Sequence, residues 1–276
     1  MFFKNYFLKE KLKKKSYFIW NNEIKNIQSV NHFRPLDLNL IIGVNDQKTI
    51  LTENTISFAD GNFTNNALLW GARGNGKSSL IKSVFNYVAL KNKNLKLIQL
   101  NKNNIFDIEL IYTIIGKFIE FRFIIFIDDL SFEKIDSDYK IIKSTLDGSI
   151  QNQPTNILLY VSSNRRHLMP RDMIDNERSS AIHTDESVEE KISLSDRFGL
   201  WIGFHKLSQI DYLKIIETYC KYYNILYTDG IKKEGIQWSL QRGNRTGRTA
   251  WQFILNLASK NNLKILYFYV TFRVLL

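Results

Sequence analysis

The stretch that decides the fold is NNALLWGARGNGKSSLIKS, residues 65–83. It contains the apolar run ALLW, which predicts a buried strand, and it leads into SSLIKSVFNYVAL, which predicts a helix. Three glycines lie between the two, at positions 71, 74 and 76. Glycine lets the backbone curl so that consecutive N–H groups point inward, an arrangement that binds anions. The stretch therefore predicts an anion-binding loop between a strand and a helix.

The loop fits the spacing G-x-x-x-x-G-K-[ST] of a nucleotide-binding loop. We expect Lys77 to reach the β- and γ-phosphates of ATP and the Ser78 hydroxyl to ligate Mg²⁺, with the dipole of the following helix assisting. A chance match is the alternative, and the flanking strand and helix argue against it. The expected nucleotide-binding residues here are Gly71, Ala72, Arg73, Gly74, Asn75, Gly76, Lys77, Ser78 and Ser79.

A second phosphate motif follows at FIIFIDD, residues 123–129. Asp128 ends an apolar run, so its carboxylate is expected at the carboxyl edge of a strand, where ligands bind in open α/β sheets. We expect Asp128 to hold Mg²⁺ and Asp129 or Glu133 to polarise the attacking water. A helix N-cap is the alternative role for Asp129.

The runs LKLIQL (residues 95–100), FRFIIFID (121–128), NILLYVSS (156–163) and LWIGF (200–204) predict further buried strands. The segments between them are long enough for crossover helices, so the expected fold class is α/β with a parallel sheet. After residue 207 the pattern changes to helical spacing at Ile210, Leu213, Ile216 and Cys220, and again at Ala250, Phe253, Ile254 and Leu257. Ser208 and Asp211 predict a capping box. A small all-helical unit therefore follows the core.

The composition sets wider limits. The chain has 276 residues and a net charge of +11, which we interpret as the result of a chain rich in Lys, Asn and Ile. An anionic partner such as nucleic acid is the alternative. The opening MFFKNYFLKEKLKKKSYFIW lacks the features of a secretory signal, and we expect a solvated basic, aromatic arm, with a helix on a partner as the alternative.

With one cysteine, Cys220, no internal disulfide forms, so a reducing, cytoplasmic location is expected. The apolar run at residues 263–276 is too short to span a membrane.

A third polar group follows the strand that ends YVSSNRRHL. Ser162, Ser163 and Asn164 are expected at the same sheet edge, where an amide orients the attacking water and senses the γ-phosphate. This is the sensor-one position of AAA+ ATPases. The order of loop, Asp128–Asp129, Asn164 and helical unit resembles that superfamily, in which the sensor strand lies between the strands that bear the two phosphate motifs.

Five blocks narrow the resemblance: NALLWGARGNGKSSLIK, IFIDDLSFE, SSNRRHLMPRDM, EEKISLSDRFGLWIGF and GRTAWQF. They resemble the bacterial AAA+ family catalogued as domain of unknown function 815. The resemblance implies a three-layer P-loop NTPase core with a parallel sheet, followed by a helical lid. The strand and helix patterns divide the chain into a basic arm (residues 1–35), an α/β core (36–206), a helical unit (207–260) and an apolar tail with no assigned role (261–276). The resemblance implies that the core binds ATP and that the helical unit is a lid.

The resemblance also implies roles for residues outside the two motifs. Ile42, Gly43 and Val44 would pack around the nucleotide base. Arg248 would be the lid's second sensor, with Arg242 and Arg245 as competitors for that role. Arg197 would reach the nucleotide of a neighbouring subunit, with Arg165 and Arg166 as alternatives and an intramolecular ion pair with Asp196 or Glu190 as the other interpretation.

Together these features predict a magnesium-dependent ATPase that acts on an unknown protein or nucleic-acid client. They do not fix the oligomeric state, although an Arg197 that reaches a neighbouring subunit would imply a homo-oligomer. Two alternatives stay open. Asp129 is shorter than the Glu of most hydrolytic AAA+ relatives, which favours an ATP-gated switch that barely hydrolyses ATP. The basic charge favours a DNA-associated ATPase resembling helicase loaders. The histidines are scattered and no zinc-binding spacing occurs.

Overall fold

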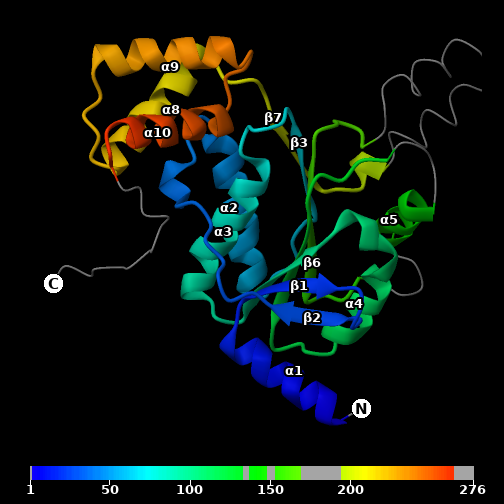
Figure 1. Ribbon diagram of the computed structural model, residues 1–276. Coiled ribbons are helices and arrows are strands. Elements are labelled where there is room, and N and C mark those ends of the chain that lie inside the picture. Colours follow the sequence, from blue (N-terminus) through cyan, green and yellow to red (C-terminus); the bar gives the residue numbers. More distant parts are fainter. Residues whose placement is uncertain (1, 133–136, 148–152, 169–193, 264–276) are drawn as a thin grey trace, which may run out of the picture.

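The computed structural model describes residues 2–132, 137–147, 153–168 and 194–263 (Figure 1). Glu133, Glu190 and most of the apolar tail therefore lie outside the described residues. The strands of the sheet are β1 (Tyr17–Asn21), β2 (Asn26–Ser29), β3 (Ala67–Gly71), β4 (Leu95–Leu100), β5 (Arg122–Ile127), β6 (Ile157–Ser163) and β7 (Leu200–Phe204). The helices of the core are α1 (Phe2–Lys14), α2 (Asn45–Ala59), α3 (Lys77–Lys91), α4 (Ile108–Ile115) and α5 (Ser137–Asp147), with short 3₁₀ turns η1 (Leu38–Leu40) and η2 (Lys102–Asp107).

The strands form one sheet in the order β2-β1-β4-β5-β6-β3-β7. Every neighbouring pair is parallel except β1 and β2. The five strands predicted from the apolar runs are thus confirmed as a parallel sheet. Strand β6 lies between β3 and β5, so the ends of all three strands meet at one edge of the sheet.

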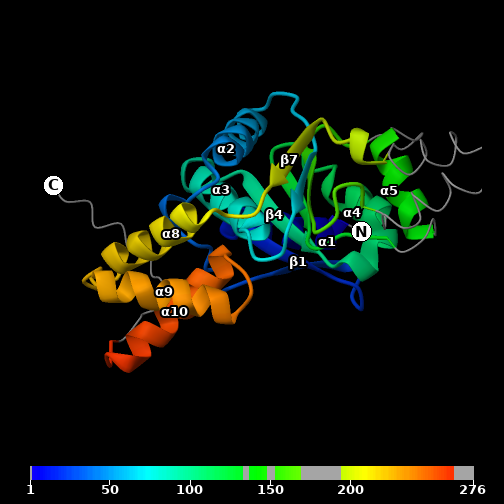
Figure 2. The same ribbon diagram turned by 90° about the horizontal axis from the view of Figure 1, so that it is seen from above.

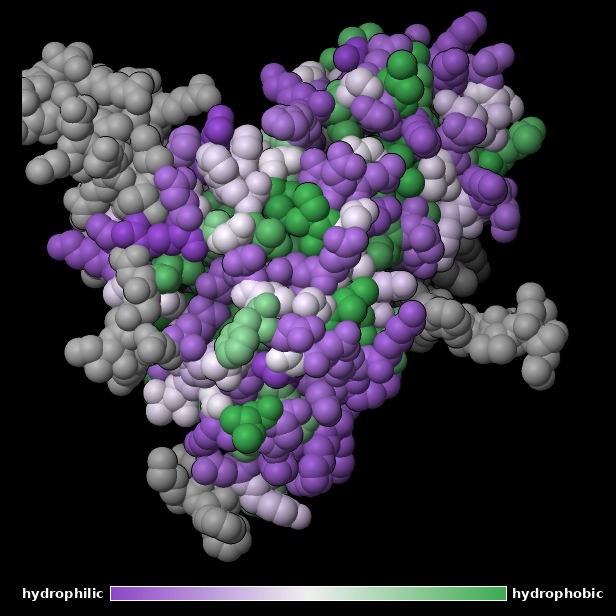
Figure 3. All heavy atoms as spheres, turned by 180° about the vertical axis from the view of Figure 1, so that it is seen from behind, coloured by the Kyte–Doolittle hydropathy of each residue, from purple (hydrophilic) through white to green (hydrophobic). Residues whose placement is uncertain are grey.

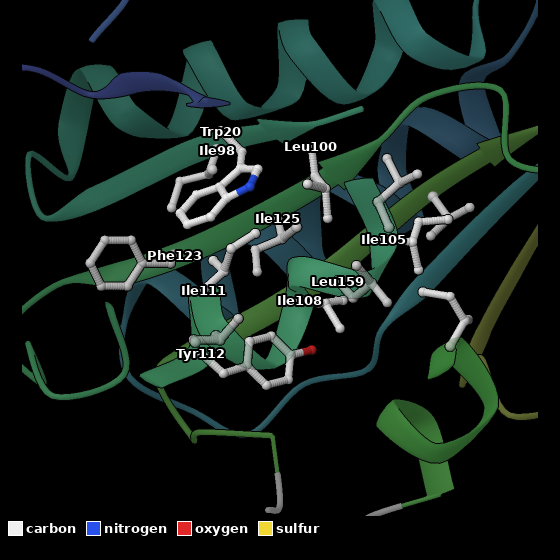
Figure 4. Close-up of a cluster of buried hydrophobic side chains, with 14 of the residues drawn as sticks. Trp20, Ile98, Leu100, Ile105, Ile108, Ile111, Tyr112, Phe123, Ile125 and Leu159 are labelled. Carbon is white, nitrogen blue, oxygen red and sulfur yellow. The ribbon is translucent and has the colours of Figure 1, made fainter. Parts of the chain in front are cut away.

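Each face of the sheet carries its own apolar core. In β5, Phe123 and Ile125 belong to the core beside α4, whereas Ile124 and Phe126 belong to the core beside α2 and α3. Figure 2 shows these helices on opposite sides of the sheet. Figure 4 shows the first of the two cores, where side chains from β4, β5 and β6 meet those of α4. A strand buried on both faces reads as a continuous apolar run, which is why the sequence predicted it.

The N-terminal segment differs from the expected solvated arm. Residues 17–29 form a hairpin that extends the sheet through parallel pairing of β1 with β4. Phe18 and Trp20 alternate inward into the core, and the Trp20 indole N–H donates to a carboxylate oxygen of the buried Asp107 at 2.8 Å. The expectation was wrong because the lysines that precede the hairpin obscured a period-two apolar pattern.

The helical unit consists of α8 (Gln209–Tyr222), α9 (Asp229–Gln241) and α10 (Gly247–Lys260), packed around one apolar cluster. The capping box of Ser208 and Asp211 at the start of α8 is confirmed. Ile210, expected on the apolar face, is 79% exposed, because the buried face of α8 instead includes Tyr212 and Tyr219. Leu40 of η1 also belongs to this cluster, so the segment before α2 joins the helical unit to the sheet. No helix of the described ranges has the length and apolarity needed to cross a membrane.

Gly71 offers a test of how β3 enters the loop. Its φ is +133°, and an added Cβ would lie 2.1 Å from the Phe204 carbonyl oxygen of β7. A backbone oxygen cannot move aside, so we expect Gly71→Ala to destabilise the fold by about 3 kcal/mol or more, combining overpacking with left-handed strain. Gly243→Ala is the matched control, because its φ is also positive but no atom lies within 4 Å. Urea unfolding of both variants measures the difference, and equal losses would contradict the clash.

Candidate nucleotide-binding site

The loop between β3 and α3 has the strand–loop–helix geometry that the motif requires. Gly71, Gly74 and Gly76 all have positive φ, and α3 begins at Lys77 as predicted. Gly74 makes a close approach, since a Cβ there would lie 2.9 Å from the Thr246 hydroxyl oxygen of the helical unit. The loop therefore touches both the sheet and the helical unit.

Lys77 is buried beneath the loop. Its ammonium donates to the carbonyl oxygens of Gly71 at 2.7 Å and Ala72 at 2.9 Å, and to Oδ1 of Asn164 at 3.1 Å. Burial lowers the pKa of Lys77 to about 8, because it disfavours the charged form more than the nearby Asp129 and Asp128 carboxylates favour it. Lys77 is thus held at the sheet edge, where a bound anion would stabilise its charged form.

Asp128 and Ser78 lie in contact, as expected for a shared metal site. Oδ1 of Asp128 accepts hydrogen bonds from the hydroxyls of Ser78 and Ser162, both at 2.5 Å. Mg²⁺ prefers oxygen ligands and is usually held by one or two carboxylates together with substrate phosphates and waters. The hydroxyl and carboxylate oxygens therefore fit Mg²⁺. The described residues hold no cluster of three or more His, Cys, Asp and Glu that would form an all-protein metal cage.

Asp129 faces Asn164 across the ends of β5 and β6. The Asn164 amide donates to Oδ1 of Asp129, while its own Oδ1 accepts from Lys77. The backbone N–H of Asp129 donates to the Ser162 hydroxyl at 3.0 Å, and its φ is +55°. The N-cap alternative for Asp129 is wrong, because residues 130–132 after it are not helical. One amide thus links the loop lysine to the second carboxylate.

These side chains line a cavity of about 720 Å³ between the sheet edge and the helical unit. The Arg248 backbone N–H donates to the Gly74 carbonyl oxygen at 3.2 Å, so the start of α10 rests on the loop. Cationic side chains at Arg34, Arg73, Lys77 and Arg248 line it together with the Asp128 and Asp129 carboxylates. The apolar part of the lining comes from residues 35–42, from Leu207 and from the helical unit. The cavity therefore combines charged and polar groups from the loop and the sheet edge with apolar groups from the segment before α2 and from the helical unit.

Most of the predicted site residues come together here. Those that line the cavity are Arg73, Gly74, Asn75, Gly76, Lys77, Ser78, Ser79, Asp128, Asp129, Asn164 and Arg248. Gly71 and Ala72 contribute their carbonyl oxygens to Lys77 beneath it. Ile42 also lines the cavity, whereas Gly43 and Val44 do not. A Cβ at Gly43 would lie 3.3 Å from a Leu207 methyl carbon. Val44 is buried in a core cluster at the start of α2.

The competing arginines lie elsewhere. Arg242 stacks over the Trp238 ring at 4.5 Å, and Arg245 donates to Gln209 at 3.2 Å. Arg165 donates to the Phe132 carbonyl oxygen at 2.7 Å, and Arg166 lies over the Trp201 ring at 4.8 Å. Arg197 is half-buried and does not line the cavity.

Several lining residues were missed by sequence reasoning. They are Arg34, Pro35, Leu36, Leu40, Ile41, Leu207, Ile215, Tyr219, Gly247 and Trp251. The apolar ones carry no signal that separates them from ordinary core positions. Ser162, which was expected at this sheet edge together with Asn164, also lines the cavity.

The sheet order, the loop and the helical unit define the AAA+ type of P-loop fold. Solved structures agree: the chain matches the Thermotoga maritima RuvB Holliday junction branch migration motor with a TM-score of 0.54 at 18% identity, over 83% of this chain and 67% of that one. It matches domain III of the Thermotoga maritima replication initiation protein DnaA with a TM-score of 0.52 at 12% identity, over 84% of this chain and 92% of that one. It matches the Aeropyrum pernix ORC1 protein, solved in complex with DNA, with a TM-score of 0.55 at 15% identity, over 83% of this chain and 65% of that one. At these identities the likeness shows the fold alone.

The chain belongs to the family described as protein of unknown function (DUF815), which matches residues 13–261. The resemblance inferred from the five sequence blocks is thus confirmed. No curated protein matches the chain.

Proposed function

We propose that the protein binds ATP with Mg²⁺ in this cavity and hydrolyses it, and that the helical unit acts as a lid that transmits the change to a client. The observation that carries the proposal is the convergence of Lys77, Asp128 and Asn164 on one cavity beneath a glycine-rich loop. The AAA+ fold supports nucleotide binding independently of the side chains.

The polar end of the cavity accounts for phosphate binding. Loop N–H groups and the start of α3 would bind the phosphate oxygens. The Lys77 ammonium would exchange its carbonyl partners for the β- and γ-phosphates. Ser78 and Asp128 would hold Mg²⁺, which when bound neutralises charge between the phosphates.

The apolar end accounts for the base. Leu36, Ile41 and Ile42 approach from the segment before α2, and Tyr219 and Trp251 approach from the lid. A base bound between them would contact both the segment before α2 and the helical unit. These two parts of the molecule already share one apolar cluster, which includes Leu40 of that segment. Nucleotide binding and lid position are therefore coupled in this proposal.

Asp129 and Asn164 would act on the attacking water. Asp129 would accept its proton and Asn164 would orient it. Both are engaged with each other, and Asn164 also holds Lys77. When phosphates draw the Lys77 ammonium away, the Asn164 carbonyl oxygen becomes available to the water, so ATP itself would complete the site.

The pKa of Lys77 supplies the experiment. With a pKa of about 8, the Lys77 ammonium of the free protein loses its proton above pH 8. A bound triphosphate would keep the Lys77 side chain protonated. Binding then takes up a proton, and ATP affinity is expected to be level below pH 8 and about tenfold weaker at pH 9 than at pH 7. Equilibrium binding of fluorescent ATP with Mg²⁺ measures this. A Lys77→Arg control stays charged and should show a flat profile. An equal slope in both proteins would contradict the assignment.

A second candidate function follows from Asp129. A short carboxylate already bonded to Asn164 also suits a protein that binds ATP, closes its lid and recruits a partner with little hydrolysis. Steady-state phosphate release separates the two: sustained turnover that Asn164→Ala reduces supports the ATPase, and binding without turnover supports the switch.

We also propose that the protein forms a homo-oligomer in which an arginine reaches a neighbour's nucleotide. Arg197 does not line the cavity of its own subunit, which suits a role in another subunit. Sizing the protein with and without ATP tests this part. An unchanged monomer would contradict it.

A further inference from the structure

The positive charge of the chain is concentrated at its N-terminal end. Residues 1–35 include eight Lys and Arg and two Glu, so they carry six of the eleven excess positive charges. Most of these lysines lie in or directly after α1, which Figure 1 places at the end of the molecule away from α8, α9 and α10. Neither the loop nor the proposed hydrolysis uses this end.

Helix α1 has two distinct faces. Leu8 and Leu12 are buried in the core on the inner face. Phe7, Lys11 and Lys14 follow the i, i+4, i+7 spacing that places residues on one helix face, and all three are exposed, Phe7 by 68%. The helix is thus anchored by two leucines and presents an aromatic ring among lysines to solvent.

The loop after α4 lies beside this helix. The Lys9 ammonium and the Glu120 carboxylate are 2.6 Å apart, which joins α1 to residues 116–121. In this loop Ile119 is 78% exposed and Lys117 is also exposed. A second apolar side chain thus stands close to the lysines of α1. Figure 3 shows this end of the molecule as mostly hydrophilic with a small hydrophobic group in it.

The local acids do not cancel the charge. Glu120 holds Lys9, and Glu10 holds Lys13 at 2.7 Å. Lys11, Lys14 and Lys15 form no ion pair with any residue of the described ranges. An unpaired cluster of exposed lysines attracts an extended anionic surface over a distance of about one Debye length, roughly 8 Å at physiological salt.

We propose that the outer face of α1 and the loop at residues 116–121 form a docking surface for anionic phospholipid membranes. The lysines would contact headgroups, and Phe7 and Ile119 would enter the interface between headgroups and acyl chains. Single-stranded nucleic acid fits less well, because it binds in a groove lined by aromatic rings. The exposed rings of Tyr6 and Phe7 lie instead on the outer surface of a helix. The cavity described above and a smaller one between α2 and β7 both lie elsewhere.

Co-sedimentation with vesicles tests the proposal. We expect the full chain to bind vesicles of phosphatidylcholine mixed with phosphatidylserine, to ignore vesicles of phosphatidylcholine alone, and to release as salt rises. Lys11→Glu with Lys14→Glu should weaken binding at least about tenfold, since each lysine near such a surface contributes on the order of a factor of five. Phe7→Ser with Ile119→Ser should weaken binding at unchanged net charge.

Lys232→Glu with Lys233→Glu in α9 is the matched control, because both lysines are exposed and lie in the lid. It makes the same change in net charge and should leave vesicle binding unchanged. Circular dichroism and thermal unfolding check that each variant is folded. Equal loss in both charge variants would show non-specific attraction and overturn the proposal. Binding of single-stranded DNA at the same salt without vesicle binding would also overturn it.

Discussion

Lys77→Ala is expected to weaken ATP binding by about 10- to 100-fold. The Lys77 ammonium makes three hydrogen bonds to uncharged oxygens in the free protein. In the complex it would bond charged phosphate oxygens, and a hydrogen bond to a charged group contributes about 1.5–3 kcal/mol. Each 1.4 kcal/mol is about a tenfold change in affinity. Isothermal titration with Mg²⁺ and ATP measures the loss.

Two further variants keep this result interpretable. Lys91→Ala removes an exposed lysine from the last turn of the same helix and should leave binding unchanged. Lys77→Met keeps the length of the buried side chain, so a loss of binding without a loss of stability to urea isolates the ammonium. A Lys77→Ala protein that binds ATP as tightly as the parent would contradict both the ATPase and the switch.

The parts of the fold that the sequence predicted are those with a single strong pattern. The run from Phe123 to Ile127 is apolar throughout because both faces of β5 are buried, which is the pattern of a strand inside a parallel sheet. The loop was predicted because glycine spacing and Lys77 are chemically specific. Asp128 followed from its position at the end of a buried strand.

The parts that could not be predicted depend on contacts between distant segments. Phe18 and Trp20 enter the core only because β1 pairs with β4, about eighty residues further along the chain. Tyr219 and Trp251 line the cavity because the helical unit packs against the loop, yet their spacing alone is that of any buried helix face. The prediction of Gly43 and Val44 was wrong by one or two residues, because the chain lines the cavity at Ile41 and Ile42 and α2 then begins at Asn45.

Asp129→Asn is expected to reduce phosphate release by about 100- to 10,000-fold, the range for loss of a positioned general base. The parent must first show sustained release, because its absence would support the switch. Asparagine keeps the carbonyl oxygen that the Asn164 amide contacts, so the site geometry should survive. It cannot accept a proton. ATP affinity should stay within about threefold, since Lys77, Ser78 and the loop remain in place.

The control for this change is Asp60→Asn, at an exposed carboxylate just after α2. It should hydrolyse ATP at the parental rate. If Asp129→Asn does the same, Asp129 is not the general base, and the contact between Asn164 and Asp129 serves only to hold the sheet edge. If hydrolysis falls while binding is retained, then one amide positions both the carboxylate that takes the proton and the lysine that binds the phosphate. In that case the shortness of Asp129 is no obstacle to turnover, because the water needs only to lie between Asp129 and an Asn164 that phosphate binding has released from Lys77.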